Sequence, residues 1–133
     1  MSSRSLIVMP DDTGKPLVDA IDGARESIRI KMFLFSDPSL LAAVIAAHQR
    51  GVKVRVMLNP ARREGEPENE ATRQALEKAG VDVADTNPAI DLTHEKSMVV
   101  DDETAFIQSL NWETRNLTVT RDYAVVTSHR HEV

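Results

Sequence analysis

The stretch 93–101, Thr-His-Glu-Lys-Ser-Met-Val-Val-Asp, decides the fold around it and contains the pattern H-x-K-x4-D. Its apolar residues 98–100 predict a buried strand. A second apolar run at 105–107 follows the polar segment 101–104 and predicts a partner strand. We therefore expect an antiparallel hairpin whose open end carries polar side chains from both strands.

The register of this hairpin determines which side chains meet. If residues 102–103 form a two-residue turn, Lys96 lies opposite Ser109 and His94 lies opposite Asn111. Directly opposed residues have Cβ atoms about 5 Å apart, and His94 and Lys96 share a face because side chains alternate along a strand. Asp-Glu is not a favoured sequence for such a turn, and a longer loop would shift the pairing. The expectation is four polar groups gathered at one end of the hairpin.

This pattern resembles the signature of the phospholipase D superfamily, H-x-K-x4-D-x6-G-S-x-N. His94, Lys96 and Asp101 match its first part, and Ser109 and Asn111 follow at the family spacing. The resemblance extends upstream, where the segments 27–34, 40–48 and 50–56 look like the strand, helix and strand that precede the motif in that family. It also extends downstream to the segment 121–126, so it covers nearly the whole chain.

Three departures from the family pattern stand in this sequence. The glycine before the serine is replaced by Gln108, which narrows the site or changes its backbone geometry because glycine allows close approach of a ligand. The acidic residue that orients the catalytic histidine is Asp122, which is shorter than the usual glutamate. The family builds one active site from two motifs, and this chain contains one.

The resemblance implies attack on phosphorus by His94, which gives a phosphohistidine intermediate. Asp122 would hold the other ring nitrogen of His94. Lys96 and Asn111 would bind non-bridging phosphate oxygens, with Ser109 assisting. A histidine from a second motif would protonate the leaving oxygen and later activate water or an alcohol. This scheme requires neither a metal nor a cofactor.

Asp101 belongs to the motif and therefore to the candidate catalytic set. Its place at the turn end of the strand, away from His94, favours a role as a structural ion or hydrogen-bond partner. His129 and His131 form H-x-H, but the sequence places no third ligand beside them, so we expect a solvated tail and no metal site.

Strands and helices alternate along the chain. Apolar alternation predicts strands at 6–9, 28–34, 52–58, 81–83 and 123–126, and helical spacing predicts helices at 16–24, 38–50 and 70–79. Such alternation indicates an α/β fold with a mixed, largely parallel sheet flanked by helices on both faces, which is the α/β/α sandwich of the resembled family. Residues 1–133 are expected to form one domain. It could be the N-terminal half of a two-motif protein or a single-motif protein that pairs with itself.

Composition narrows the possible functions. The chain has 133 residues, 41% of them hydrophobic, a net charge of −5 and no cysteine. The negative net charge argues against sequence-independent binding of nucleic acid. The absence of cysteine excludes disulfides and thiolate chemistry. No signal peptide is apparent, and the longest apolar run, at 40–47, is too short to span a bilayer. A cytoplasmic protein, or one peripheral to the membrane, is expected.

Two classes of function follow. The first is an enzyme that cleaves a phosphodiester or transfers a phosphatidyl group, preferably on phospholipid in cardiolipin-type chemistry, with nuclease activity as the alternative. Its second motif would come from a dimer mate or from a covalently linked half. The second class is a non-catalytic half that binds phosphate or phospholipid groups, in which Gln108 marks lost chemistry.

Overall fold

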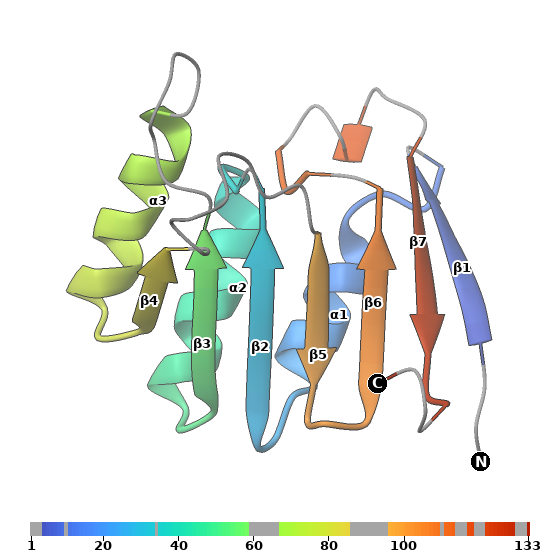
Figure 1. Ribbon diagram of the computed structural model, residues 1–133, viewed down its shortest axis with the longest axis horizontal. Helices are drawn as coiled ribbons and strands as arrows, with labels where there is room; N and C mark the ends of the chain where they lie inside the picture. Colours follow the sequence, from blue (N-terminus) through green and yellow to red (C-terminus); the bar gives the residue numbers. More distant parts are fainter. Residues whose placement is uncertain are drawn as a thin grey trace.

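The computed structural model describes residues 4–9, 11–33, 35–58, 67–85, 96–109, 111–113, 117–118, 122–129 and 133. These residues form one seven-stranded sheet in the order β1-β7-β6-β5-β2-β3-β4 (Figure 1). The strands are β1 (Arg4–Met9), β2 (Ser27–Met32), β3 (Lys53–Leu58), β4 (Asp82–Asp85), β5 (Ser97–Val100), β6 (Thr104–Gln108) and β7 (Asp122–Thr127). The helices are α1 (Lys15–Asp22), α2 (Pro38–Gln49) and α3 (Pro67–Lys78).

The sheet is mixed, as the sequence predicted, but it is not largely parallel, because antiparallel strand pairs outnumber parallel ones among the described strands. Strands β2, β3 and β4 are parallel neighbours, each joined to the next through a helix. Strands β5, β6, β7 and β1 pair antiparallel, and β5 joins this half to the parallel half by pairing with β2. The α/β class is therefore confirmed.

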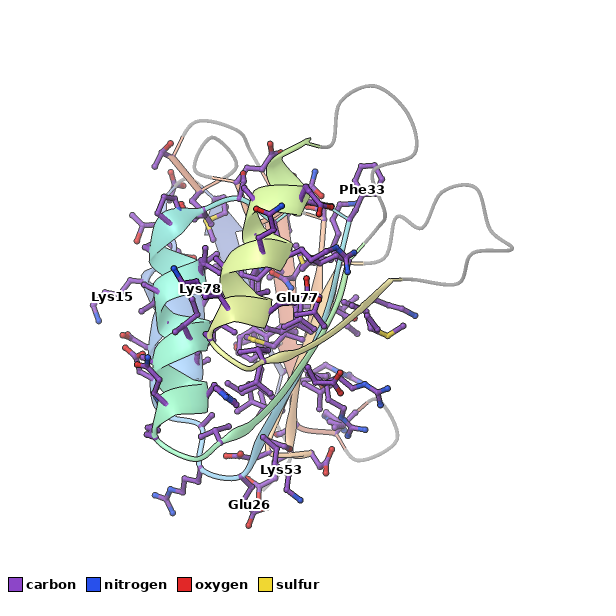
Figure 2. The ribbon with its side chains drawn as sticks, turned by 90° about the vertical axis from the view of Figure 1, so that its left-hand side faces the viewer. Lys15, Glu26, Phe33, Lys53, Glu77 and Lys78 are labelled. Carbon is purple, nitrogen blue, oxygen red and sulfur yellow. The ribbon has the colours of Figure 1, made fainter. Side chains whose placement is uncertain are left out.

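The described helices all cover the same face of the sheet, which differs from the expected helices on both faces (Figures 1 and 2). Strand order explains this arrangement. The crossovers from β1 to β2, from β2 to β3 and from β3 to β4 all advance in the same direction across the sheet. Right-handed crossovers that advance in one direction place their helices on one face, and helices on both faces would require the order to reverse.

The hydrophobic core lies between this sheet face and the helices. Alternate residues of β2 and β3, such as Ile28, Ile30 and Val56, are buried there against Leu40 and Leu76 of the helices. Each such side chain contributes about 1.5–3 kcal/mol through burial. The other face carries Arg29 and Arg55 and also the exposed side chains Leu6, Ile107, Tyr123 and Val125. In the described part of the chain, no helix is long and apolar enough to cross a bilayer.

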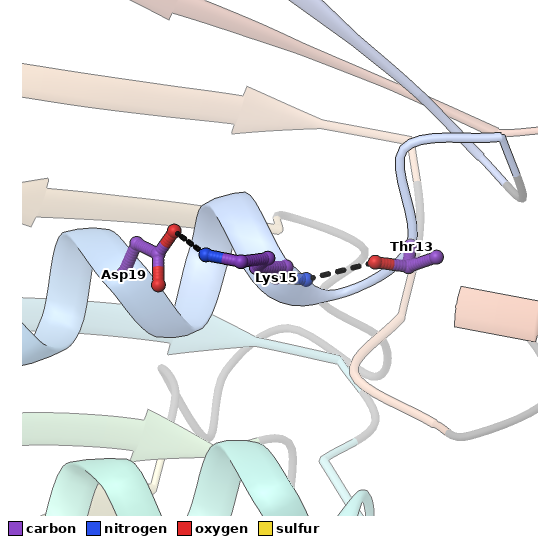
Figure 3. A network of polar contacts seen from close by, with 3 residues as sticks. All are labelled: Thr13, Lys15 and Asp19. Carbon is purple, nitrogen blue, oxygen red and sulfur yellow. Dashed lines mark hydrogen bonds and ion pairs between the residues drawn. The ribbon is translucent and has the colours of Figure 1, made fainter.

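The helix starts follow local rules. Asp37 caps α2 by accepting a hydrogen bond from the Leu40 N–H at 3.0 Å. At the start of α1, the Lys15 N–H donates to Thr13 Oγ1 at 3.2 Å and the Lys15 ammonium pairs with Asp19 one turn later at 2.7 Å (Figure 3). These contacts are solvent-exposed, so they define the start of the helix more than they stabilise the fold.

Helix α3 begins at Pro67, earlier than the predicted start at Glu70. Asn69, which directly precedes the predicted helix, is 2% exposed. Its Oδ1 accepts from the Phe35 N–H at 2.9 Å, and its Nδ2 donates to the Phe33 carbonyl oxygen at 2.7 Å. The side chain satisfies backbone groups of the segment between β2 and α2, which explains why a polar residue is buried here.

The hairpin register differs by one residue from the predicted one. Val100 pairs with Thr104, so residues 101–103 form a three-residue turn, and Lys96 lies opposite Gln108 and not opposite Ser109. Asp101 and Asp102 both adopt positive φ, 55° and 54°. Aspartate tolerates the left-handed region better than most residues do, and this conformation provides the longer turn that Asp-Glu could not form in two residues.

Candidate active site

One edge of the sheet gathers the predicted polar residues. Strands β2 and β6 end at this edge, whereas β5 and β7 begin there because they run antiparallel to those strands. Lys96 precedes β5, Ser109 follows β6 and Asp122 begins β7. Figure 2 shows Phe33, just after β2, at this edge and Glu26 and Lys53 at the opposite one. Strand direction therefore brings together residues from separate parts of the chain.

Lys96 lies at the centre of this edge and is partly buried. Its ammonium nitrogen stands 5.5 Å from the centre of the Phe33 ring, which is a cation–π contact. Burial lowers the pKa of Lys96 below the ordinary lysine value, and the negative charge of Asp122 offsets part of this shift. The Asp122 carboxylate is thus close enough to influence the lysine charge from two strands away.

Ser109 and Asp122 form a hydrogen-bonded pair between the end of β6 and the start of β7. The Ser109 hydroxyl lies 3.2 Å from Asp122 Oδ1, to which it can donate, and it accepts from the Tyr123 N–H at 2.9 Å. The Ser109 N–H donates to the Tyr123 carbonyl oxygen at 2.9 Å. These backbone bonds fix the serine beside the carboxylate, which favours a defined site geometry.

Gln108, the residue that replaces the family glycine, is held by Trp112. The Trp112 Nε1–H donates to Gln108 Oε1 at 2.8 Å. Trp112 is fully buried and meets Phe35 edge-on, with ring centres 4.9 Å apart. The backbone N–H groups of Ser36 and Asp37 both donate to the Trp112 carbonyl oxygen at 2.8 Å. Trp112 is therefore a core residue, and its indole N–H holds the Gln108 side chain in place.

Asn111 lies in the connection from β6 to β7, directly before Trp112. Its Oδ1 is buried and has no hydrogen-bond partner, and the same holds for Gln108 Nε2. Within the described ranges, these are the only buried side-chain polar atoms without a partner. Unsatisfied buried polar atoms are rare and often belong to functional sites.

His94 lies outside the described residues. Its predicted place opposite Asn111 assumed the two-residue turn, which the hairpin does not form. The other predicted residues divide into two groups. Lys96, Ser109, Asn111 and Asp122 lie at one edge of the sheet, whereas Asp101 lies at the opposite edge, beyond the other end of β5. At about 3.4 Å per residue, Lys96 and Asp101 are roughly 17 Å apart along the strand.

Asp101 anchors the hairpin turn to the start of β2. Its carboxylate accepts from the backbone N–H groups of Arg25, Glu26 and Ser27 at 2.7–3.1 Å, and its own N–H donates to the Ser27 carbonyl oxygen at 2.7 Å. Burial raises the pKa of Asp101, but these backbone hydrogen bonds outweigh it and hold the pKa below its usual value. This placement and these hydrogen bonds favour the structural interpretation of Asp101, and its membership of the catalytic set stays a prediction.

A large hollow lies away from these residues. It encloses about 630 Å³ at the opposite edge and is lined by residues that include Lys53, Arg29 and Arg55. Both arginines pair with carboxylates there, Arg29 with Asp102 and Arg55 with Asp82. The lining of this hollow includes Ser27 and His48, but the polar residues that the motif predicted, Lys96, Ser109 and Asp122, lie at the other edge, so we place the candidate active site there. Among the described residues, no group of three or more histidine, cysteine or carboxylate side chains could hold a metal ion.

The sequence did not indicate two contributors to the site. The Phe33 ring contacts the Lys96 ammonium. The sequence gave little indication of this contact, because Phe33 lies at the end of an alternating strand pattern. Asn69, on helix α3, forms hydrogen bonds with the Phe33 carbonyl oxygen and the Phe35 N–H. Its position just before the predicted helix gave no sign that it would be buried.

Comparison with known proteins agrees with this geometry. The sequence profile of the family described as "Cardiolipin synthase, PLD-like domain" matches residues 17–133. The mitochondrial cardiolipin hydrolase of Homo sapiens is 35% identical over 112 residues, which cover 84% of this chain and 42% of the relative. A phospholipase D of Rickettsia prowazekii is 33% identical over 104 residues, which cover 77% of this chain and 48% of the relative. The chain thus spans somewhat less than half the length of these relatives.

A solved structure also matches. The crystal structure of Nuc from Salmonella typhimurium, described as a phospholipase D family member, superposes with a TM-score of 0.85 at 26% identity, covering 96% of this chain and 84% of that one. The sequence profile, the relatives and the structural match agree, and the chain belongs to the phospholipase D superfamily, within its cardiolipin synthase-like group.

Proposed function

We propose that this chain supplies one half of an active site that breaks phosphodiester bonds through a phosphohistidine at His94. The observation that carries the proposal is the gathering of Lys96, Ser109 and Asp122 at the edge where β5 begins, directly after the segment that contains His94. A cation, a hydroxyl and a carboxylate next to a histidine are the groups that this reaction needs.

In the first step, a ring nitrogen of His94 attacks phosphorus. An N–P bond forms, and the P–O bond to the leaving group breaks. Asp122 holds the other ring nitrogen, so the ring presents its lone pair to phosphorus. Lys96 and Asn111 bind the non-bridging oxygens, with Ser109 assisting, and stabilise the negative charge that develops there.

A second histidine completes the reaction and comes from a second motif. It donates a proton to the leaving oxygen, and it then removes a proton from water or an alcohol that attacks the phosphohistidine. The N–P bond breaks, and the product is a phosphate ester or a transferred phosphatidyl group. The second motif is provided either by another copy of the chain through a twofold interface or by a covalently linked half.

Phospholipid is the proposed substrate. Similarity to a cardiolipin hydrolase and to a phospholipase D supports this choice, as does the net charge of −5, which disfavours sequence-independent binding of nucleic acid. A nucleic-acid phosphodiester is the alternative, and the same residues would act on it.

The test measures phosphodiester hydrolysis in EDTA on three substrates, namely an activated aryl phosphodiester, cardiolipin-containing vesicles and single-stranded DNA. We expect turnover of the aryl diester and of cardiolipin, and the loss of both in His94→Asn. Faster turnover of DNA than of cardiolipin would reverse the substrate assignment. Phosphate binding without turnover at any protein concentration would support a non-catalytic half-domain and contradict the proposal.

A further inference from the structure

The side chain of Gln108 contains a buried hydrogen-bond donor without a partner in the described part of the chain. This donor is its Nε2. Leaving such a group unpaired is unfavourable, and native structures retain few of them. The reaction scheme above gives Gln108 no role, so this donor requires an acceptor that the described residues do not provide.

Chemistry fixes the orientation of the carboxamide. The Trp112 indole N–H can only donate a hydrogen bond, so the Gln108 atom 2.8 Å away must be the oxygen. The nitrogen is then the other atom of the group. The unpaired atom is therefore an NH₂ donor that requires an acceptor, and exchanging the two amide atoms would lose the Trp112 bond.

Register places this donor beside the proposed phosphate-binding groups. Gln108 lies directly opposite Ala124 on β7 and opposite Lys96 at the start of β5. Directly paired residues point to the same sheet face with Cβ atoms about 5 Å apart. Asp122 shares this face, because it lies two residues from Ala124 along β7. Gln108 thus stands between Lys96 and Asp122, which interact electrostatically across it.

We propose that Gln108 is a further substrate-binding residue, whose Nε2 donates a hydrogen bond to a non-bridging oxygen of the substrate phosphate. The inference rests on the proposed function and deepens it. A phosphate has several acceptor oxygens, so an anion held by Lys96 can also accept from the neighbouring amide. Where the resembled family has glycine, this chain places a further side-chain donor beside Lys96, Asn111 and Ser109 and binds the phosphate with an additional hydrogen bond.

The experiment measures inorganic phosphate binding by calorimetry, and KM and kcat on the aryl phosphodiester. Gln108→Met keeps the length of the side chain and removes the donor. Gln108→Glu also removes the donor but keeps an oxygen for Trp112. Because it adds a negative charge that itself repels phosphate, this variant is decisive only if phosphate binding is unchanged, which would contradict the idea. Gln49→Met is the matched control, because Gln49 is an exposed glutamine at the end of α2, at the opposite edge of the sheet.

Both Gln108 variants are expected to weaken phosphate binding and to raise KM by about tenfold or more, the usual effect of losing a hydrogen bond to a charged group. Gln49→Met should change neither quantity. The pH above which kcat/KM falls, which depends on the loss of the Lys96 proton, should be the same in Gln108→Met as in wild type, because this substitution leaves the charge of Lys96 intact. A shift of this alkaline limb would instead indicate that the whole site is disturbed and would overturn the assignment.

Phosphate binding and KM within twofold of wild type in both Gln108 variants would also overturn it. Failure of the proposed function gives a different result, because His94→Asn would then retain turnover. If His94→Asn is inactive and the Gln108 variants bind phosphate normally, the phosphohistidine mechanism stands and only the role of Gln108 falls. A wild-type chain that neither binds phosphate nor turns over substrate refutes both proposals.

Discussion

Gln108 and Lys96 are direct partners across the hairpin, with the Gln108 N–H donating to the Lys96 carbonyl oxygen at 2.9 Å. This bond makes the glutamine that replaces the family glycine a neighbour of the lysine that would bind phosphate. It also sets Ser109 one residue further along, where it meets Asp122 and Tyr123. The geometry of the site therefore depends on a single backbone register.

Lys96→Ala should lower kcat/KM by about 100-fold or more, because the ammonium stabilises charge that develops on the phosphate. Only the protonated lysine can do this. Since burial lowers the pKa of Lys96, activity should fall as pH rises through a value below that of an ordinary lysine. A pH profile of kcat/KM measures this limb. A wild-type profile that stays flat up to the pKa of an exposed lysine would contradict the assignment.

Asp122→Asn should reduce kcat on the order of 100-fold, because the amide cannot orient the nucleophilic histidine as a carboxylate does. It should also move the alkaline limb to lower pH, since the Asp122 charge raises the pKa of Lys96. The matched variant is Ser109→Ala, which removes an uncharged partner of the same carboxylate and should leave the limb in place. An unmoved limb in Asp122→Asn would argue against this electrostatic coupling.

Asp101→Asn should lower the free energy of unfolding by about 2 kcal/mol at neutral pH, through weaker hydrogen bonds from three backbone N–H groups. The pKa of Asp101 is lowered by folding, so its stabilisation is present above the unfolded-state pKa and is lost as pH falls through the folded-state value. Denaturant unfolding at several pH values should show the difference between the variant and wild type disappearing in acid.

The control for this experiment is Asp102→Asn, which removes an exposed ion pair with Arg29 and should change stability little. Activity per folded molecule should be retained in Asp101→Asn, because the residue lies at the edge opposite to Lys96. A selective loss of kcat in a stably folded Asp101→Asn protein would favour the catalytic assignment of Asp101.

Mixing of subunits tests whether two copies build one site. If each site needs a histidine from both copies, mixtures of wild type with His94→Asn at saturating dimer concentration should lose activity as the square of the wild-type fraction. Activity per chain should also rise with protein concentration in wild type alone. Activity that is linear in the wild-type fraction would show that each chain works independently.

Local sequence predicted most of the elements and the edge at which the site lies. The apolar runs and the strand alternation are local signals, and strand direction alone places Lys96, Ser109 and Asp122 together. The hairpin register could not be predicted, because it depends on left-handed backbone at Asp101 and Asp102.

Non-local features account for the other differences. Helices were expected on both faces because alternation of strands and helices does not reveal strand order, and this order advances in one direction. The early start of α3 depends on Asn69, whose partners are backbone groups more than thirty residues away in the sequence, at separations of 34 and 36. The hydrogen bond from Trp112 to Gln108 likewise requires the folded connection after β6.

The central claim is a covalent bond between His94 and phosphorus, and trapping the intermediate tests it most directly. The chain is mixed with an activated phosphodiester, quenched in alkali within the first turnover to preserve phosphohistidine, digested and analysed by mass spectrometry. We predict that the peptide containing His94 gains the mass of the phosphoryl fragment while the leaving group is released in equal amount. Release of the leaving group with His94 unmodified, or with the adduct on another residue, would contradict the mechanism.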